Sequence, residues 1–384
     1  MLDFGFNSTR SIVVEYGGAA RLADRIAEMG YRNVLMVTDP GVVKAGLLDP
    51  VLAGFTKRPE LRVVTFSDVQ ADPPEEVILA AAAAARGHSA DCVVGFGGGS
   101  SLDAAKLAAL LAGSGEALSS IYGVNQARGP RLPLILVPTT AGTGSEATPI
   151  SIVTTGEGEK KGVVSPSLLP DLALLDAELT LGLPTPITAA TGIDAMVHAI
   201  EAYTSKRLKN PISDAFACES LRLMSTSLHK ACRMGSDRQA RENLMLGACM
   251  AGMAFANAPV AAIHALAYPV GARFHVPHGL SNALMLGPVL RFNQEAALPL
   301  YAKLQDVVRP GTTGSEAQRA SAFCAYMARL SGELGLPVRL RDVGIQESDV
   351  PQLAADAMNQ TRLLVNNMRE LTLADAHALY AEAL

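Results

Sequence analysis

Four side chains in the second half of the chain have the types and spacing of metal ligands. Asp194 and His198 lie four residues apart in TGIDAMVHAIEAY, a stretch with helical periodicity, so both are expected on one helix face. His264 and His278 follow in the next strongly apolar region. Three nitrogens and one oxygen suit Fe²⁺ or Zn²⁺, and such an ion can still expand its coordination to take a substrate oxygen. The pattern predicts a catalytic metal site.

Each of these residues also has an ordinary structural explanation. Asp194 alone would be a satisfied polar group, and a single histidine would be a core residue bonded to a backbone carbonyl. Four of them in Ala-, Val-, Leu- and Met-rich sequence would need four separate partners, which favours one shared ion. His275 is excluded as a ligand because it lies three residues before His278 in a segment interrupted by Pro277. The remaining histidines lie among polar residues and are expected at the surface: His88, His229 and His377.

A glycine-rich loop in the first half of the chain has the composition of a phosphate-binding site. In VVGFGGGSSLDAAK an apolar strand leads into Gly97, Gly98, Gly99 and Ser100, and a helix is expected to begin near Leu102. Glycines let the backbone approach a ligand, and the N–H groups at a helix start attract a phosphate. The loop is not the G-x-G-x-x-G fingerprint, because a serine takes the sixth position. A tight turn without a ligand is the alternative, although three successive glycines lose more conformational entropy than such a turn requires.

Asp39 indicates which dinucleotide this loop would bind. It ends the strand NVLMVT, where a carboxylate accepts a hydrogen bond from an adenosine ribose hydroxyl and repels a 2′-phosphate. NAD is therefore favoured over NADP. Taken by itself, Asp39 would be a helix N-cap ahead of Pro40 and Gly41, and only its pairing with the glycine loop favours the cofactor role.

A second loop, PTTAGTGSEATP, follows the strand PLILV and carries several hydroxyl groups. Ligands of open α/β sheets collect at the carboxyl ends of the strands, where hydroxyls can bind phosphate or ribose. We therefore expect this loop to line the cofactor. Its candidate residues are Thr139, Thr140, Thr143, Ser145 and Thr148.

Two domains of different architecture are predicted to carry these groups. Residues 1–183 alternate short β-rich runs with amphipathic helical stretches, which is typical of an α/β dinucleotide-binding domain with a parallel sheet. Residues 184–384 are rich in Ala, Leu and Met with almost no β-branched run, so an all-helical metal and substrate domain is expected. The boundary falls in LGLPTP, where two prolines disfavour continuation of either element. The β-rich runs cover residues 33–38, 61–66, 92–95 and 133–137.

Composition excludes several other classes of protein. The net charge of −5 leaves no basic surface for nucleic acid. The start, MLDFGFNSTRSIVVEYGG, lacks the features of a secretory signal, and no apolar run reaches the roughly 18 residues that span a bilayer. We expect a cytoplasmic protein without a membrane or nucleic-acid partner. The five scattered cysteines form no CxxC pair and are expected to be buried or on helix surfaces.

Five segments together resemble the iron-containing (group III) alcohol dehydrogenase family over nearly the whole chain. They are GGGSSLDAAK, PTTAGTGSEATP, GIDAMVHAIEAY, HALAYPVGARFHVPHGLSNALML and LLVNNMRELTLADAHALY. The resemblance implies an α/β domain followed by a helical domain, with a cleft between them that holds NAD and the metal, and a homodimer. It places the metal ligands on the same four residues, with the metal left open between Fe²⁺ and Zn²⁺.

Further site residues follow from the resemblance alone. Lys161, just before GVVS, would be a positive group near the cofactor, and Ile150 and Phe255 would line the substrate pocket. The family's cofactor contacts fall on Asp39, Gly97, Gly98, Gly99, Ser100, Thr139, Thr140, Thr143 and Thr148.

Two positions depart from the family pattern. Many members have a second histidine four residues after the first in HGxAHP, whereas this chain has Tyr268 in HALAYP, four residues after His264. If the segment is helical, both project from one face, and we expect catalytic roles for His264 as a ligand and for Tyr268 as a hydrogen-bond donor to the substrate oxygen or a relay water. An aromatic wall that only packs is the alternative for Tyr268. Near the carboxyl terminus, Asn-Pro-Arg is replaced by Asn367, Met368 and Arg369.

The predicted activity is hydride transfer between NAD(H) and a small, mainly apolar alcohol/aldehyde or ketone, with the metal as Lewis acid. One alternative is a dehydroquinate synthase-like lyase, which uses NAD and a metal but needs several basic residues near the metal, where Arg273 is the only close cation. A metal-dependent hydrolase is the second alternative, and it leaves the glycine loop unexplained. The identity of the alcohol stays open, because one methylene changes binding by only about 1–3 kcal/mol.

Overall fold

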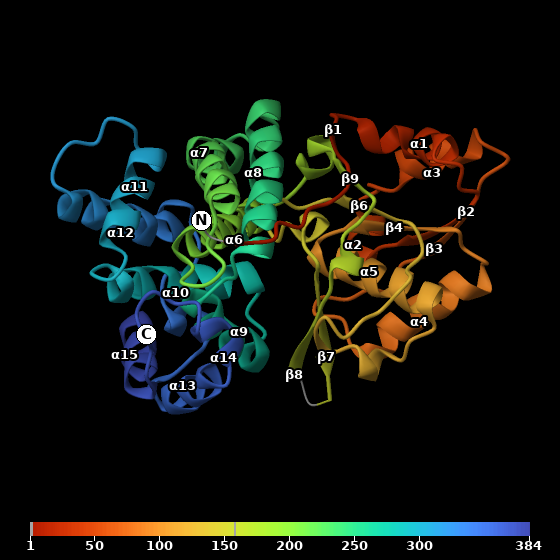
Figure 1. Cartoon of the computed structure of the whole chain (residues 1–384). Coiled ribbons are helices and arrows are strands. Elements are labelled where there is room, and N and C mark those ends of the chain that lie inside the picture. Colours follow the sequence, from red (N-terminus) through yellow and green to blue (C-terminus); the bar gives the residue numbers. More distant parts are fainter. Residues whose placement is uncertain (1–2, 157–158) are drawn as a thin grey trace. The chain divides into compact units, whose positions relative to one another are not determined.

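The computed structural model describes residues 3–156 and 159–384, which form two compact units (Figure 1). One unit is Asn7–Gly182. The other is Leu183–Leu384 together with residues 3–6, and the ring of Phe6 stacks on that of Phe216 in this unit at 5.9 Å between centroids. Each unit has its own elements and core.

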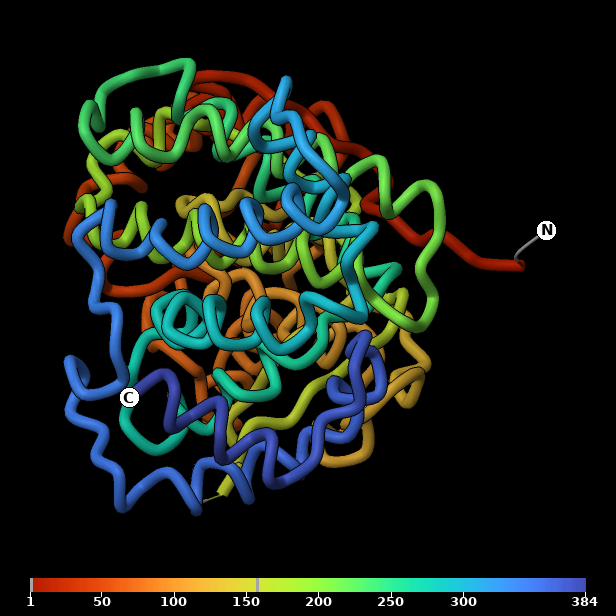
Figure 2. Tube along the Cα trace, turned by 90° about the vertical axis from the view of Figure 1, so that its left-hand side faces the viewer, coloured from red at the N-terminus to blue at the C-terminus, as the bar shows by residue number. Residues whose placement is uncertain are grey.

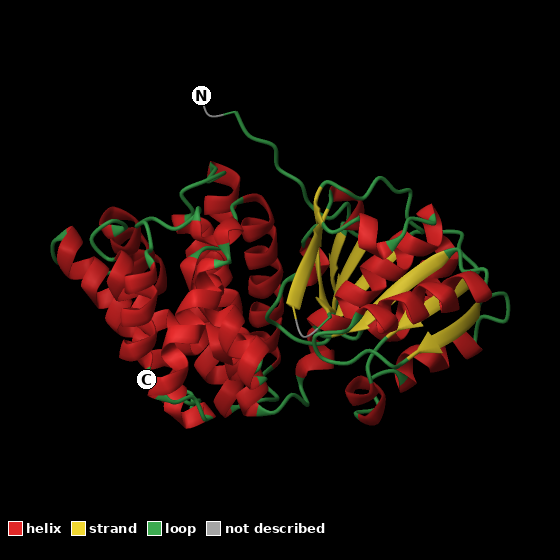
Figure 3. Ribbon diagram, turned by 90° about the horizontal axis from the view of Figure 1, so that it is seen from below, coloured by secondary structure: helices red, strands yellow, loops and turns green. Residues whose placement is uncertain are grey.

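A six-stranded parallel sheet forms the centre of Asn7–Gly182, in the order β1-β9-β6-β4-β2-β3 (Figure 3). β4 and β6 are buried at every position, as continuous apolar strands of a parallel sheet must be. The sheet confirms the predicted α/β architecture, and the four β-rich runs of the sequence are all strands. The strands are β1 (Ile12–Val14), β2 (Asn33–Val37), β3 (Arg62–Phe66), β4 (Cys92–Gly97), β6 (Leu134–Pro138) and β9 (Leu172–Leu175).

Helices cover both faces of this sheet. Alternate residues of a strand point to opposite faces: Leu35 and Val93 belong to one buried cluster, whereas Val34 and Val94 belong to another. The first cluster includes residues of α4 (Glu75–Gly87) and α5 (Gly99–Ser114), and the second includes residues of α1 (Leu22–Glu28) and α3 (Asp49–Thr56). The short helix α2 (Pro40–Lys44) follows β2.

Strand register places the two predicted cofactor loops next to each other. Val37 of β2 is opposite Gly95 of β4, and Gly97 of β4 is opposite Pro138 of β6. Because the three strands are parallel, the chain leaves all of them at the same edge of the sheet. Asp39, the glycine loop and the threonine loop therefore begin on neighbouring strands, which is where ligands bind in open α/β sheets.

A second, three-stranded sheet has the order β5-β8-β7, and two of its strands, β7 and β8, follow the threonine loop in the chain. β7 (Ile150–Thr155) and β8 (Glu159–Val164) pair antiparallel, and β8 pairs parallel with β5 (Gly123–Val124). This second sheet was not predicted from the sequence, because EKKGVV has too many charged residues for a clear strand signal.

The second unit has helices and no strand among its described residues, as predicted (Figure 3). The helices appear as coils of the Cα trace in Figure 2. Its central helix, α6, is buried at most positions and packs against α7, α8 and α10. Side-chain caps define several helix starts; for example, Asn210 accepts a hydrogen bond from the backbone N–H of Ser213. The helices are α6 (Thr185–Thr204), α7 (Pro211–Arg233), α8 (Arg238–Asn257), α9 (Ala262–Phe274), α10 (His278–Asn293), α11 (Leu298–Val308), α12 (Glu316–Glu333), α13 (Val350–Met358), α14 (Thr361–Leu364) and α15 (Leu373–Ala383).

Among the described residues, no single helix is long and apolar enough to cross a membrane. The bent pair α8 and α9 passes the same test by length and composition only. That is weak evidence for a membrane span, because core helices of soluble proteins pass it too.

Candidate metal centre and cofactor-binding loops

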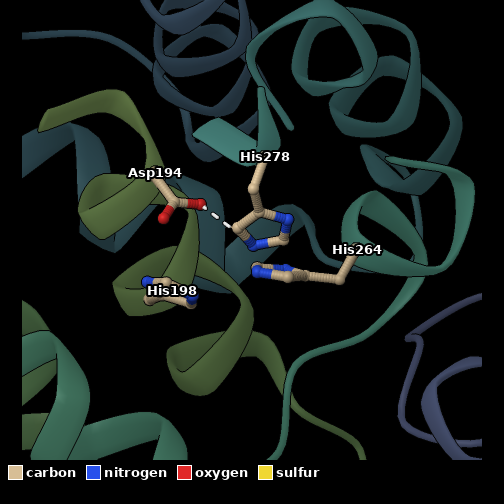
Figure 4. Close-up of side chains that lie close together, drawn as sticks. All are labelled: Asp194, His198, His264 and His278. Atoms are coloured by element: carbon tan, nitrogen blue, oxygen red, sulfur yellow. Dashed lines mark ion pairs between the residues drawn. The ribbon is translucent and has the colours of Figure 1, made fainter. Parts of the chain in front are cut away.

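The four predicted metal ligands come together in the helical unit (Figure 4). Asp194, His198, His264 and His278 each offer one ligand atom, and these atoms lie within 4.8 Å of one another. Asp194, His198 and His264 are at most 4 % exposed, while His278 is partly exposed. Three of the four candidate ligands are therefore buried, and His278 is the one with an accessible side chain.

Three helices supply the cluster. Asp194 and His198 lie one turn apart on α6, as their spacing predicted, His264 lies in the first turn of α9, and His278 is the first residue of α10. The Nε2 atom of His278 is 3.6 Å from Oδ1 of Asp194. The ring of His198 stacks between two neighbours, at 4.7 Å from His264 and 4.3 Å from Phe255 between centroids.

A glycine sets the approach of α10 to α6. A Cβ atom on Gly279 would lie 2.5 Å from the carbonyl oxygen of Ala190, which is closer than real Cβ atoms come. Only glycine at this position lets the start of α10, and with it His278, lie this close to Asp194.

Two further polar residues contact the cluster, and the sequence analysis missed both. Glu201 on α6 lies 2.6 Å from Nδ1 of His264, and Asn282 on α10 donates a 2.6 Å hydrogen bond to Oδ1 of Asp194. The Nδ2 atom of Asn282 is also 3.2 Å from Nε2 of His264 and 3.3 Å from Nε2 of His278. The signal that could have found them is the one used for the ligands: polar residues at buried positions of apolar helices need partners.

The electrostatics of the cluster favour an ionised carboxylate. Burial by itself would raise the pKa of the Asp194 carboxyl, but the imidazoles of His198, His278 and His264 and the hydrogen bond from Asn282 together hold that pKa below its usual value. Asp194 thus stays an anion, with Oδ1 at 3.6 Å from Nε2 of His278.

The residues present fit a divalent cation. Several lone-pair-bearing atoms crowded into a buried volume repel one another unless a cation lies between them. Three imidazole nitrogens and one carboxylate oxygen are the ligand chemistry of Fe²⁺ and Zn²⁺.

Tyr268 and Phe255 lie beside the cluster, as the resemblance implied. The ring of Tyr268 is edge-on to His264 at 6.3 Å and tilted to His278 at 5.9 Å between centroids. Tyr268 and Phe255 both pack against a small apolar cluster that includes Val260. Their substrate and proton-donor roles stay predictions.

Ile150 and Lys161 belong to the α/β unit. Ile150 begins β7, and its carbonyl oxygen accepts a hydrogen bond from Lys106. Lys161 lies on β8, with its ammonium nitrogen 3.3 Å from Glu159 and 5.9 Å from the ring centroid of Tyr122. Among the described residues, neither of these two contacts of Lys161 involves the glycine loop.

The glycine loop has the geometry of a helix start without a capping side chain. α5 begins at Gly99, and Gly98 before it offers no side-chain cap to the first N–H groups of the helix. A Cβ atom on Gly97, whose φ is +155°, would lie 2.6 Å from Oγ of Ser101, and one on Gly99 would lie 2.7 Å from Cγ2 of Thr143. Internal packing therefore explains Gly97 and Gly99, whereas a Cβ atom on Gly98 would make only ordinary contacts with the side chain of Thr140, at 3.7 and 3.8 Å.

Asp39 has two structural partners. Its Oδ1 accepts a 3.0 Å hydrogen bond from the N–H of Val42 and so caps α2, and its Oδ2 accepts a 2.9 Å hydrogen bond from the hydroxyl of Ser101. The N-cap alternative is thus observed, and the same carboxylate also contacts the first turn of α5. Each carboxylate oxygen keeps a second lone pair for another donor.

The threonine loop has two parts. One lies beside the glycine loop at the start of α5, and the other is buried beside Lys106. Thr139 donates its N–H to the carbonyl of Gly97 at 2.9 Å, and half-buried Thr140 and Thr143 lie next to Gly98 and Gly99. Thr148 is buried instead, with its hydroxyl 3.2 Å from Nζ of Lys106.

Lys106 is a third buried polar residue that was not predicted from the sequence. Its fully buried ammonium group donates hydrogen bonds to Ser145 and to the carbonyl of Ile150, both at 2.7 Å, and lies 3.4 Å from Asp103. Burial lowers the pKa of Lys106, and Asp103 opposes that shift. A lysine inside an apolar helix was the signal that could have indicated it. Through these hydrogen bonds, Lys106 connects α5 to the threonine loop.

Comparison with known proteins agrees with this arrangement. Residues 9–177 match the family model described as iron-containing alcohol dehydrogenase, and residues 188–384 match that of the Fe-containing alcohol dehydrogenase family, C-terminal. Long-chain-alcohol dehydrogenase 1 of Geobacillus thermodenitrificans is 40% identical over 374 residues, which cover 96% of this chain and 94% of that protein.

Solved structures share the fold over the whole chain. The crystal structure of a 1,3-propanediol oxidoreductase superposes with a TM-score of 0.95 at 32% identity and covers 100% of both chains. Sulfoacetaldehyde reductase from Bifidobacterium kashiwanohense, solved in complex with NAD⁺, superposes with a TM-score of 0.90 at 27% identity and covers 100% of this chain and 99% of its own.

Proposed function

The chain belongs to the iron-containing alcohol dehydrogenase family, and we propose that it interconverts a small alcohol and its aldehyde or ketone with NAD(H) and a divalent metal ion, Fe²⁺ by preference. The observation that carries this proposal is the convergence of Asp194, His198, His264 and His278 within 4.8 Å in the helical unit.

NAD is proposed as the cofactor on three grounds. The uncapped start of α5 beside Gly98 suits a pyrophosphate. The Asp39 carboxylate at the end of β2 would accept a ribose hydroxyl and repel the 2′-phosphate of NADP. A relative of the same fold, the sulfoacetaldehyde reductase, binds NAD⁺. Thr140 and Thr143 are the hydroxyl groups placed to add hydrogen bonds at the helix start.

When bound, the metal supplies Lewis-acid polarisation of the substrate oxygen, and NAD(H) accepts or supplies the hydride. Asp194, His198, His264 and His278 would hold the metal. Asn282 fixes the orientation of the Asp194 carboxylate through its 2.6 Å hydrogen bond.

Proton delivery is proposed to involve the phenol of Tyr268. Its ring lies 5.9 Å from that of the accessible ligand His278, and an unperturbed phenol stays protonated at neutral pH. Its Oη would donate toward the substrate oxygen as that atom gains negative charge. Phe255 contributes an apolar surface beside His198, which favours a substrate without charged groups.

Relatives differ in the substrates that their names give, which range from long-chain alcohols to 1,3-propanediol and sulfoacetaldehyde. We therefore propose the class of substrate only. The lyase alternative is less well supported, because Arg273, the only cation expected near the metal, is paired with Asp356.

The experiment is an NAD-linked screen of short alcohols and aldehydes with anaerobically purified, Fe²⁺-loaded protein. We expect metal-dependent turnover that changes NADH absorbance, that is lost after chelation and that returns when Fe²⁺ is added. Metal-dependent turnover without any change in NADH absorbance would instead support a lyase or a hydrolase.

A further inference from the structure

Glu201 is a buried carboxylate in the middle of the helical unit. It lies on α6, three residues after His198, and is 3 % exposed. Among the described residues, its one ion-pair partner is His264, and no lysine or arginine pairs with it. A buried carboxylate without a cationic partner is costly, so its hydrogen bonds must account for its presence.

Two donors on α9 face the two oxygens of this carboxylate. Oε1 accepts a 2.7 Å hydrogen bond from the backbone N–H of Ile263, and Oε2 lies 2.6 Å from Nδ1 of His264. α9 begins at Ala262 and has no side-chain cap from the residue before it. Glu201 therefore satisfies an N–H in the first turn of α9 and holds the ring of the next residue at the same time.

The contact determines which nitrogen of His264 carries the proton. An ionised carboxylate only accepts hydrogen bonds, so Nδ1 of a neutral imidazole beside it must be the donor. Nε2 then keeps its lone pair. Nε2 is also the nitrogen on the cluster side, because it lies 3.2 Å from Nδ2 of Asn282, which contacts Asp194.

We propose that Glu201 is a positioning residue that fixes His264 in the tautomer and ring orientation required to bind a metal through Nε2. The proposal rests on the proposed function only for the presence of a metal site, not for the reaction. Carboxylates that accept the second N–H of a ligating histidine orient the ring and raise its basicity, and their loss typically costs about 10–100-fold in metal affinity.

Glu201→Gln is the sharpest variant, because glutamine has the same shape but only one acceptor oxygen. If that oxygen keeps the N–H of Ile263, the NH₂ group faces Nδ1 of His264. Nδ1 of the imidazole can accept a hydrogen bond from this NH₂ group only if the ring proton is on Nε2. A protonated Nε2 has no lone pair with which to bind a metal. Replacing one carboxylate oxygen with an NH₂ group thus favours the tautomer of His264 that cannot bind a metal through Nε2.

The control is Thr204→Val on the same helix. The Thr204 side chain is buried, its hydroxyl donates to the carbonyl of Ile200 at 2.8 Å, and the described structure shows no contact with the four ligands. The variant removes a buried polar group of α6 without touching Glu201 or His264. It therefore measures what any such change in this helix does to metal binding.

The measurement is the Zn²⁺ dissociation constant of the apoprotein, obtained by competition with a chromogenic chelator without NAD or alcohol. We expect Glu201→Gln to weaken Zn²⁺ binding by about 10–100-fold and Thr204→Val to leave it close to wild type. In a His264→Ala background, Glu201→Gln should have little further effect, because the residue acts through His264. Wild-type Zn²⁺ affinity in Glu201→Gln, or an equal loss in the His264→Ala background, would overturn the proposal.

A second measurement needs no Glu201 variant. ¹⁵N-histidine NMR of the wild-type apoprotein, with the His264 signals assigned from their loss in His264→Ala, should show the proton on Nδ1. A proton on Nε2 would overturn the proposal even if Glu201→Gln failed to fold. Metal affinity and tautomer are both independent of turnover, so a protein that binds Zn²⁺ as expected but oxidises no alcohol would refute the proposed function and leave this inference standing.

Discussion

The backbone of Gly279 packs against Ala190 so closely that a Cβ atom on Gly279 would lie 2.5 Å from the Ala190 carbonyl oxygen. This contact brings the first turn of α10 against α6, so that His278 reaches the carboxylate of Asp194. The candidate metal site thus depends on a close approach of two helices as well as on its four candidate ligands.

We therefore expect Gly279→Ala to separate the two helices and to weaken metal binding while the ligands are all present. Overpacking of this kind costs about 1–3 kcal/mol of the free energy of unfolding. Gly271→Ala on α9 is the control, because its Cβ atom would come no closer than an ordinary 3.4 Å contact. Zn²⁺ affinity of the two apoproteins checks the prediction, and equal affinities would show that the site tolerates the displacement.

Asp39→Asn should relax the preference for NAD over NADP. Asparagine keeps one oxygen to accept from the N–H of Val42 and places an NH₂ group beside Ser101, whose hydroxyl can accept instead of donate, so both contacts can be kept while the charge is lost. The measurement is the ratio of kcat/KM for NAD to that for NADP. An unchanged ratio would mean that Asp39 acts only as a helix cap and a partner of Ser101.

Lys106→Met should weaken NADH binding without changing metal affinity. Methionine keeps most of the buried aliphatic chain but leaves Ser145 and the Ile150 carbonyl without their donor, and each such buried group costs about 1–3 kcal/mol. The threonine loop then loses its tie to α5. NADH titration by fluorescence tests this, with the exposed Lys57→Met as control, and wild-type affinity would contradict it.

Tyr268→Phe separates the two roles open to that residue. If the hydroxyl donates to the reacting oxygen, its removal should lower kcat by about 10-fold to 100-fold and alter the pH profile. If the ring only packs beside His264 and His278, both should stay near wild type. Measuring kcat as a function of pH distinguishes the two roles. If the ring only packs, the proton must come from water or from the nicotinamide ribose.

The four candidate ligands could be identified as a group from the sequence because each signal was local or compositional. The spacing of Asp194 and His198 defines a helix face, and His264 and His278 stand out as polar residues in apolar sequence. The strands were predictable for the same reason, since β4 and β6 are continuous apolar runs.

What could not be predicted depends on contacts between distant residues. Glu201 and His264 are separated by 63 positions, and the Ser101–Asp39 hydrogen bond by 62. Neither pair of residues is indicated by any local spacing pattern in the sequence. The stacking of Phe6 on Phe216, which ties residues 3–6 to the helical unit, is equally invisible in a local pattern.

At the departure from the family pattern near the carboxyl terminus, Asn367 is buried in a reciprocal amide pair with Asn293 at 2.8 and 2.9 Å. The cytoplasmic location and the homodimer stay predictions.

In the proposed mechanism, one metal site in the helical unit carries the chemistry and the α/β unit holds the cofactor. The most direct test is NAD-linked alcohol oxidation by Fe²⁺-loaded His278→Ala, measured together with NADH binding by the same protein. We predict loss of turnover with NADH affinity close to wild type, because the glycine loop and His278 belong to different units. Near wild-type turnover by His278→Ala with a full complement of metal would contradict the four-residue site.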